Sequence, residues 1–251
     1  MQATLPELEK AGPLTRCIEV ASIVGACSLI IMHAVRFFNV ADLFTWRVVV
    51  AVLAALVLAD FASGVIHWIA DTWGSETLPV LGRRFLRPFR VHHINPDDFL
   101  RRDVIDTNGD VAVIAVAFFL SALLIPLVDE FQRLAAMLLF AFGACVLPTN
   151  QIHQWAHMSR PPSLVHQLQR RGLILSRENH NKHHVSPYVM NYCIVTGWCN
   201  RPLTAIGFFP ALERIITRLT GLTPRRDDLA LASRLEAPVA RMGEAVVKEN
   251  S

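Results

Sequence analysis

Apolar residues along this 251-residue chain gather into four long stretches separated by polar segments. Each stretch comes close to the roughly 20 residues that an α-helix needs to cross a bilayer. We expect membrane spans at about residues 18–38, 48–70, 111–128 and 134–149. Glu19, His33 and Arg36 make the first span the weakest, whereas the later three are apolar at mid-depth. The pattern predicts an all-α, integral-membrane four-helix bundle within residues 18–223.

The polar segments predict how the chain is oriented. Two of them, one between the second and third spans and one after the fourth, are rich in arginine: Arg83, Arg84, Arg87, Arg90, Arg101, Arg102, Arg160, Arg170, Arg171 and Arg177. The tight connection between the third and fourth spans carries the acidic pair Asp129 and Glu130. Because basic loops remain on the cytosolic side, we expect both arginine-rich segments and the N-terminal residues 1–17 to face the cytosol. Residues 224–251 are expected to form a polar tail.

A further apolar stretch begins after Arg201 and has helical spacing. Its apolar residues are Leu203, Ile206, Phe208, Phe209, Leu212, Ile215, Ile216 and Leu219. Arg214 and Arg218 interrupt the stretch, which predicts an amphipathic helix. Two interpretations remain: the helix lies on the membrane surface, or it packs on the core of the cytosolic part.

Composition agrees with a membrane protein and excludes other classes. Hydrophobic residues make up 53% of the chain and charged residues 18%, and the mean hydropathy is +0.37. A net charge of +3 without a Lys/Arg-rich block does not suit nucleic-acid binding. The five cysteines include no C-x-x-C pair, so they predict neither a disulfide framework nor a zinc–thiolate site.

Histidine is the unusual residue, and eight of the ten histidines fall in four clusters at predicted span ends. The clusters are His67 with Asp71 in GVIHWIADTWG, His92 and His93 in HHINP, His153 and His157 in NQIHQWAH, and His180, His183 and His184 in HNKHH. Residues four apart on a helix share a face, so each such pair can direct two side chains at one point. All four clusters lie on the predicted cytosolic side and together predict a histidine-rich cap. His33 and His166 stand alone and are expected to be ordinary interfacial residues.

The residue types in these clusters are those of a metal centre. Neutral imidazole binds zinc, copper, iron and nickel. Eight histidines and one aspartate are more than one four-coordinate zinc needs, so the pattern favours a pair of metals. A zinc protease is disfavoured, because Gln154 follows His153 and Trp68 follows His67 where H-E-x-x-H requires glutamate. A metal transporter would carry its ligands near mid-membrane.

Several longer runs carry a resemblance to a known family. The runs GVIHWIADTWG, LRPFRVHHINP, DTNGD, TNQIHQWAH and HHVSP…YCIVTGWCNRPL resemble the Kua-type lipid desaturases, within the membrane fatty-acid desaturase and hydroxylase superfamily. The match extends from about Asp60 to Asp228. DTNGD (106–110) and TGW (196–198) are closer to the branch that acts on plasmanyl phospholipids, and NYCIV (191–195) to the branch that acts on acyl chains.

The resemblance implies a reaction and a set of ligands. Two irons would be held by His67, His92, His93, His153, His157, His180, His183 and His184, with Asp71 as a further ligand or an anchor for the others. With O2 and electrons from a separate donor of cytochrome b5 or ferredoxin type, such a centre removes two hydrogens from adjacent carbons of a membrane phospholipid. In the plasmanyl branch these are the first two carbons of the sn-1 alkyl chain, and the product is a vinyl ether.

Some alternatives remain open at this point. An acyl-chain desaturase or hydroxylase would use the same chemistry, whereas a zinc-dependent membrane hydrolase or a metal transporter would belong to another class. We expect a bacterial inner membrane, with the endoplasmic reticulum as the alternative. The lipid headgroup is expected among Arg83, Arg84, Arg87 and Arg90, because arginine forks bind phosphate well.

Overall fold

The computed structural model of this chain describes residues 11–40, 45–75, 77–79, 82–95 and 97–225. Over these residues the regular structure is helical, with no β-strand, as the sequence predicts. The polar tail predicted from residue 224 falls almost entirely outside the described residues, as does most of the segment 1–17.

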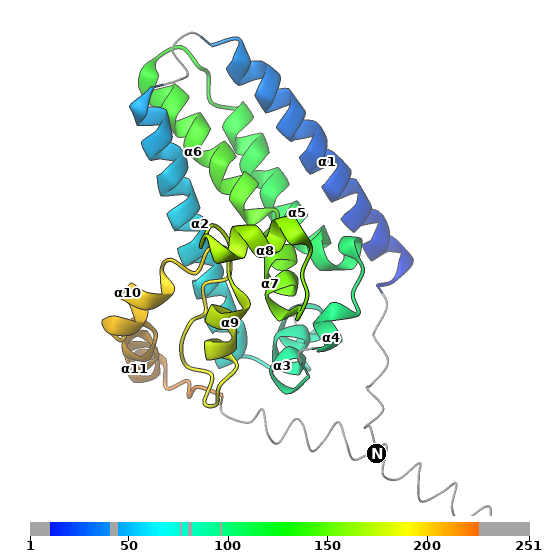
Figure 1. Cartoon of the computed structure of the whole chain (residues 1–251), viewed down its shortest axis with the longest axis vertical. Helices are drawn as coiled ribbons and strands as arrows, with labels where there is room; N and C mark the ends of the chain where they lie inside the picture. Colours follow the sequence, from blue (N-terminus) through cyan, green and yellow to red (C-terminus); the bar gives the residue numbers. More distant parts are fainter. Residues whose placement is uncertain (1–10, 41–44, 76, 80–81, 96, 226–251) are drawn as a thin grey trace, which may run out of the picture.

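Four long helices form the bundle: α1 (Pro13–Phe38), α2 (Trp46–Thr72), α5 (Val104–Leu123) and α6 (Glu130–Val146). In the described part of the chain, four helical segments have the length and hydropathy to cross a membrane, the last of them running from α6 through α7 (Thr149–His157). α1 packs on α5, and α6 packs on both α2 and α5 (Figure 1). The predicted four-span architecture is confirmed.

Small residues lie between the helices, and large apolar residues face outward. Ala26, Ala115 and Ala136 are fully buried, which allows the helix backbones to approach closely. Val24 and Val57 are 60% and 42% exposed, and the outer faces of the bundle carry many side chains like them. A bundle that is apolar on its outside as well as its inside suits a lipid environment rather than water.

The polar residues of the first span bind the neighbouring helix. The Nε2 atom of buried His33 lies 2.9 Å from the carbonyl oxygen of Phe119. Arg36 donates to the carbonyls of Ala122, at 2.7 Å, and Ile125 beyond the end of α5. These contacts join α1 to backbone carbonyls in and just after the last turns of α5. The side chains that weaken the first span in a hydropathy profile therefore hold α1 against α5.

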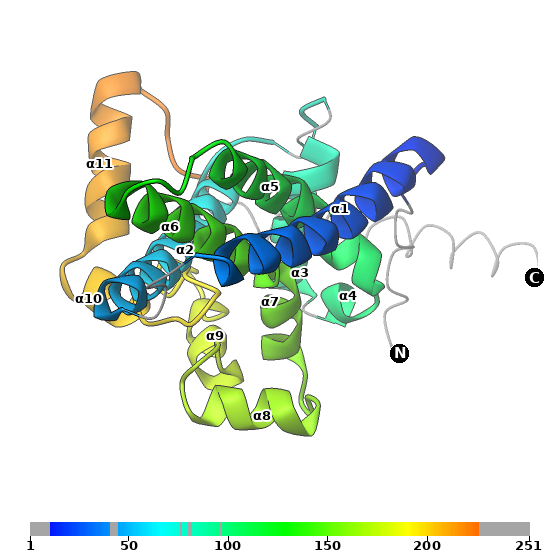
Figure 2. The same cartoon turned by 90° about the horizontal axis from the view of Figure 1, so that it is seen from above.

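The remaining helices form a cap at one end of the bundle (Figures 1 and 2). They are α3 (Arg87–Ile94), α4 (Asp97–Leu100), α7, α8 (Ser163–Arg170), α9 (Arg177–His183), α10 (Asn200–Ala205) and α11 (Phe208–Thr220), with a π-helical turn η1 (Gly82–Leu86) before α3. Both arginine-rich segments therefore lie at the same end. Three arginines lie at the opposite end. Arg36 donates to the carbonyl of Ile125, Arg47 pairs with Glu130, and Arg133 donates to the carbonyls of Leu127 and Val128.

Two helix boundaries differ from the predicted spans in ways that matter for the site. α5 begins at Val104 rather than Val111, because the Asp103 side chain accepts from the N–H groups of Ile105 and Asp106 and caps the helix. The DTNGD run therefore lies within the first turns of a membrane helix. α6 ends near Pro148, and α7 then carries His153 and His157 deeper into the cap.

The stretch after Arg201 forms two helices, α10 and α11, which Gly207 separates in a left-handed conformation with φ 62°. One face of α11 packs on the end of α2, where Trp68 donates to Glu213 at 3.2 Å and contacts Phe209. Ile215 and Leu219, beside the packed face and one turn apart, are 51% and 81% exposed. The contacts of α11 with α2 agree with the interpretation as a packed helix. The exposed apolar side chains of α11 are those that a membrane surface would cover.

Candidate metal centre

Five histidine side chains converge on one point of the cap and form what we term histidine group 1. His153 and His157 lie one turn apart on α7, His180 and His184 lie one turn apart at α9, and His92 comes from α3. Their ligand atoms all lie within 4.8 Å of one another. The Nε2 atom of His180 lies 2.9 Å from Nε2 of His153, 2.9 Å from that of His157 and 3.0 Å from that of His184.

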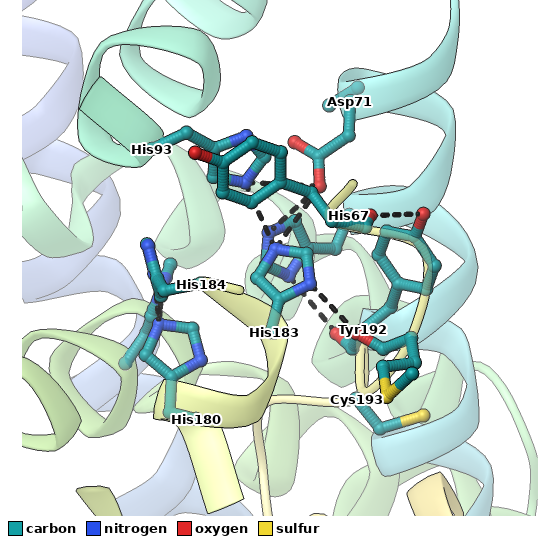
Figure 3. Close-up of polar contacts among 12 residues, drawn as sticks. His67, Asp71, His93, His180, His183, His184, Tyr192 and Cys193 are labelled. Atoms are coloured by element: carbon teal, nitrogen blue, oxygen red, sulfur yellow. Dashed lines mark hydrogen bonds and ion pairs between the residues drawn. The ribbon is translucent and has the colours of Figure 1, made fainter. Parts of the chain in front are cut away.

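Histidine group 2 lies beside the first and shares His92 with it. Its members are His67 from α2, His92 and His93 from α3, and His183 from α9, again within 4.8 Å of one another. The carboxylate of Asp71, one turn after His67, points into this group (Figure 3). Asp71 Oδ2 lies 3.3 Å from Nε2 of His67 and of His183, and 3.5 Å from Nε2 of His93. The structure thus brings all nine predicted residues together as two adjacent groups.

The spacing of these nitrogens fits metal ions. Several Nε2 atoms that face one another at about 3 Å cannot all be satisfied by hydrogen bonds, because each carries either one proton or one lone pair. The Nε2 of His92 is buried and has no hydrogen-bond partner among the described residues. Metal–nitrogen bonds of about 2 Å put neighbouring ligands of an octahedral ion about 3 Å apart. A shared cation in each group would therefore satisfy the donor set.

Backbone carbonyls select the metal-binding tautomer in group 2. The Nδ1 atom of His67 lies 3.0 Å from the carbonyl oxygen of Tyr192, and that of His183 lies 2.9 Å from the carbonyl oxygen of Met190 (Figure 3). A carbonyl can only accept, so each Nδ1 carries the proton and donates it. Each Nε2 is then left with a lone pair directed into the group, as in metal-bound histidines.

Three histidines of the cap, His92, His180 and His184, are held neutral. Burial lowers the pKa of His92 and His180 well below the usual value, and the neighbouring histidines lower it further. The same causes, burial first, lower the pKa of His184 to about 2. Metal ions bind the neutral form of imidazole, so the cap presents these side chains in the form that binding requires.

A buried carboxylate that the sequence analysis did not single out anchors this arrangement. Asp60 lies within α2 and is fully buried. It accepts four backbone N–H groups of one loop: Oδ1 accepts from Val195, Thr196 and Gly197 at 3.2, 2.8 and 2.9 Å, and Oδ2 from Cys199 at 2.9 Å. The expectation that the second span is apolar at mid-depth is wrong at this residue. An acidic residue inside an apolar run was the signal that could have identified it.

The same loop packs directly on the backbone of α2. The Ser63 hydroxyl accepts from Ile194 N–H at 3.0 Å, one turn before His67. A Cβ atom added to Gly64 would lie 2.4 Å from the Sγ of Cys193, so this close approach requires glycine. Because the loop begins next to Tyr192, these contacts position the carbonyl that orients His67.

Arg225 caps the other end of the helix that carries Asp71. Its guanidinium donates to the carbonyls of Trp73, Gly74, Ala70 and Asp71 at 2.9, 2.6, 2.6 and 2.9 Å. Its own N–H donates to the carbonyl of Thr72 at 2.7 Å. The last carbonyls of a helix have no partner within the helix, and a cation near them is favourable. The segment after α11 therefore fixes the α2 terminus beside group 2.

A cavity of about 560 Å³ runs along α5 and reaches the histidines. His92 and His153 form part of its wall. At the cap end it is lined by Arg102, Asp106, Asp110 and Asn150, and at the bundle end by Ile114, Phe118 and Phe142. From Asp106 to Phe118 the helix rises about 18 Å. The cavity is therefore long, polar at the level of the cap and apolar inside the bundle.

The remaining predicted residues lie elsewhere. His33 is buried between α1 and α5, and His166 is exposed on α8, so neither belongs to the histidine groups. Arg90, expected to face a headgroup, is 2% exposed and not available at the surface. The side chains of Arg83 and Arg84 lie outside the described part of the structure.

Comparison with known proteins identifies a family. The model of the lipid desaturase domain matches residues 56–227, which is more than half of the chain and includes every residue of both histidine groups. No solved structure shows a significant match to this chain.

Curated relatives agree with that match. A plasmanylethanolamine desaturase of Myxococcus xanthus is 43% identical over 237 residues, which cover 94% of this chain and 84% of the relative. Plasmanylethanolamine desaturase 1 of Mus musculus is 39% identical over 243 residues, covering 90% of this chain and 86% of the relative. The chloroplastic fatty acid desaturase 4 of Arabidopsis thaliana is 37% identical over 175 residues, covering 68% and 52%.

Proposed function

This chain belongs to the lipid desaturase family, and from that premise we propose that it converts plasmanylethanolamine to plasmenylethanolamine. The reaction removes two hydrogens from the first two carbons of the sn-1 alkyl chain and yields a vinyl ether. It consumes O2 and two electrons from a separate donor protein. The observation that carries the proposal is the cavity, which is polar at the cap end and apolar inside the bundle and whose wall includes His92 and His153.

The metal centre of this proposal is a pair of irons. Histidine group 1 would hold one ion, and histidine group 2 with Asp71 would hold the other, with His92 next to both. When bound, the irons supply the activation of O2 that the removal of unactivated hydrogens requires. A cluster of eight imidazoles and one carboxylate also suits other transition metals, so iron content is part of the test.

The cavity determines which carbons would be oxidised. A phospholipid in the adjacent leaflet has its headgroup at the cap end and its chain directed into the bundle, towards Phe118 and Phe142. The glycerol then lies near the first turns of α5, and the first carbons of the sn-1 chain lie beside His92 and His153. Carbons farther along the chain lie deeper along α5, away from the histidines. This layout supports oxidation next to the glycerol.

Aromatic side chains pack against the histidines on the cavity side. Phe89 lies with its ring centroid 5.0 Å from that of His67, and Phe99 lies 4.9 Å from His153. Both line the cavity. A dry, enclosed site strengthens the interactions within it and limits side reactions of the oxidant.

Electrons would enter at the edge of the cluster that the cavity does not occupy. His157 and His184 are partly exposed, whereas the other members of group 1 are buried. Neither His157 nor His184 lines the cavity. A donor of cytochrome b5 or ferredoxin type can approach this edge from the cap side. By the positive-inside rule, that side would face the cytosol. The membrane we propose is a bacterial inner membrane, with the endoplasmic reticulum as the alternative.

A second candidate is the desaturation of phospholipid acyl chains. The similarity to the chloroplastic fatty acid desaturase 4 and the NYCIV run favour it. It would use the same histidine groups and the same cavity. The two candidates differ in whether the oxidised chain is attached through an ether or an ester, and in the position of the double bond. The first carbon of an ester-linked chain is the carbonyl carbon and has no hydrogen to lose, so an acyl double bond would form farther along the chain.

Lipid analysis of cells that lack plasmalogens tests the proposal. Expression of this chain should restore vinyl-ether phosphatidylethanolamine at the expense of the saturated alkyl ether, and purified protein should contain close to two irons per chain. His153→Ala should abolish both the vinyl ether and the bound iron. His166 is exposed and lies outside the groups, so His166→Ala should change neither quantity. New double bonds in ester-linked chains without any vinyl ether would establish the second candidate. Active protein with zinc and no iron would refute the metal assignment.

A further inference from the structure

Helix α11 carries an apolar strip that the described part of the chain leaves uncovered along most of its length. The strip consists of Phe208, Ile215 and Leu219, which share one face of the helix because they are seven and four positions apart. Ile215 is 51% exposed and Leu219 is 81% exposed. The strip adjoins the face that packs on α2, where the ring centroids of Phe209 and Trp68 are 5.4 Å apart. A contiguous apolar surface of this kind marks an interaction site.

We propose that the apolar strip is inserted in the membrane leaflet next to the cap, so that α11 is an interfacial helix and the cover of the strip is lipid. The inference rests on the four membrane spans and is independent of the reaction proposed above. It unites the two interpretations of this stretch of sequence, because one face of α11 packs on α2 and the adjoining face lies in the membrane surface.

The contacts of Phe208 show which way the strip faces. The ring centroid of Phe208 is 5.7 Å from that of Phe61 on α2. Phe61 precedes Trp68 by seven residues, so it lies about 10 Å farther from the cap along α2. Phe209, on the packed face, contacts Trp68 instead. The strip side of α11 therefore faces the bilayer rather than the far side of the cap.

The level of α11 along α2 matches the edge of a bilayer. α2 begins at Trp46, which is 72% exposed, and tryptophan favours the membrane–water interface. A hydrocarbon core about 30 Å thick takes up roughly 20 residues of a helix, so its other boundary falls near Ile66. Trp68, which donates to Glu213 of α11, lies just past that boundary. α11 is thus at the level of an interfacial helix.

The direction of α11 agrees with this level. Figure 1, in which the longest axis of the molecule is vertical, shows α11 end-on, and Figure 2, seen from above, shows it lengthwise. α11 therefore runs across the bundle, close to the plane of the membrane surface. A helix in this direction keeps its whole apolar strip, from Phe208 to Leu219, at a similar depth.

Two arginines border the strip on the side that faces away from α2. Arg214 and Arg218 are exposed and lie one turn apart. At about 100° per residue they are roughly opposite Ile216, which packs against the cluster around Trp68. The order around the helix is therefore packed face, apolar strip, arginines. Basic side chains next to an inserted apolar strip lie among the lipid headgroups, where they attract anionic lipid.

Spin labels measure the depth of single side chains in the full chain. Ile215→Cys, Leu219→Cys and Arg218→Cys are each made in a Cys17→Ser/Cys27→Ser background, which removes two exposed native thiols. Each labelled protein is placed in nanodiscs of phosphatidylcholine and phosphatidylglycerol, with one chain per disc. Relaxation of the label by O2, which concentrates in lipid, is compared with relaxation by a polar nickel chelate, which stays in water.

Two matched controls set the scale. Leu53→Cys, at a 49% exposed position within α2, reports lipid, and Glu178→Cys, at an 88% exposed side chain on α9, reports water. The ratio of O2 to nickel relaxation at Ile215→Cys and Leu219→Cys should exceed that at Glu178→Cys at least about threefold, because apolar O2 partitions into lipid and the chelate does not. Arg218→Cys should give a ratio between the two controls, at the level of the headgroups.

The outcomes decide what covers the strip. A Leu219→Cys ratio equal to that of Glu178→Cys would overturn the inference, because the strip would then face water. Weak relaxation by both agents would also overturn it, because protein rather than lipid would then cover the strip. In the wild type, a phospholipid with a photoreactive acyl chain should cross-link to residues 208–219, and no such adduct beside a labelled α2 would count against lipid. None of these measurements involves turnover or metal, so their failure leaves the proposed function untouched.

Discussion

Replacing Asp60 with asparagine tests whether one buried carboxylate holds the loop that orients His67. The carboxylate accepts four backbone N–H groups, three through Oδ1 and one, from Cys199, through Oδ2. Asparagine keeps one oxygen but sets an amide NH2 against the Cys199 N–H, so two donors face each other. A hydrogen bond to a charged group contributes about 1.5–3 kcal/mol, and a buried donor left unsatisfied costs about 1–3 kcal/mol. We expect Asp60→Asn to lower the free energy of unfolding by about 3–5 kcal/mol.

Two measurements follow from that magnitude. In chains of this size the unfolding midpoint shifts by about 2–4 °C per kcal/mol, so the midpoint in detergent should fall by roughly 6–20 °C. The same loop holds the Tyr192 carbonyl 3.0 Å from His67 Nδ1. Loss of such a partner typically weakens metal binding by about 10–100-fold. Intrinsic tryptophan fluorescence reports the midpoint, and iron per chain after titration with a chelator reports the affinity.

Two further variants calibrate the result. Ser63→Ala leaves the buried Ile194 N–H without its acceptor and removes the hydrogen bond from the Ser63 hydroxyl to the Asp60 carbonyl, and it should cost about 1–3 kcal/mol. Asp129→Asn leaves a side chain that still caps α6 and should change neither measurement. An Asp60→Asn protein with the wild-type midpoint and the wild-type iron affinity would show that the loop is held by other contacts, and the reasoning would be refuted.

Four other predictions concern the metal centre and the orientation of the chain. His153→Ala should lose iron and activity while the protein still inserts in the membrane, as measured by elemental analysis and membrane fractionation; full iron occupancy would remove it from the ligand set. Asp71→Asn should lose iron if the carboxylate is a ligand. If the carboxylate only orients His67, the variant should keep some activity at high iron. Unchanged activity would show that the short distance between Asp71 and His67 has no role in the metal site. Arg225→Met should lower the affinity for iron, because it leaves carbonyls at the end of α2 without their donor. It should not affect the binding of phospholipid, because Arg225 does not line the cavity. An unchanged iron affinity would contradict the positioning role of Arg225. Single cysteines at Arg170 and in the loop before α6 should be labelled from opposite sides of the membrane, and labelling from one side would contradict the four-span topology.

The sequence was sufficient to predict the membrane-spanning elements of this protein. The four spans follow from hydropathy, and the pairing of His153 with His157 follows from the helical repeat. Both are local properties that depend on residues a few positions apart. The arginine-rich segments also predicted that the histidine clusters lie at the same end of the bundle. A segment between membrane spans can lie on only one of two sides, and its arginines indicate which one.

The tertiary structure decided how these elements form two sites. His92 joins both histidine groups and Asp71 points into the second, and these relations combine α2, α3, α7 and α9, which lie far apart in the sequence. Residues of the DTNGD run line the cavity because α5 begins early. Asp103 caps the helix at Val104, before its apolar part begins.

Asp60 and Arg225 show most clearly why the sequence was not enough. Each acts through backbone groups: Asp60 accepts N–H groups of residues 195–199, and Arg225 donates to carbonyls of residues 70–74. Every residue except proline offers the same N–H and carbonyl, so the partners of such side chains leave no pattern in the sequence. Only the packing of the loop and of the C-terminal segment against α2 brings these groups within hydrogen-bond distance, because burial in the folded chain requires each polar group to find a partner.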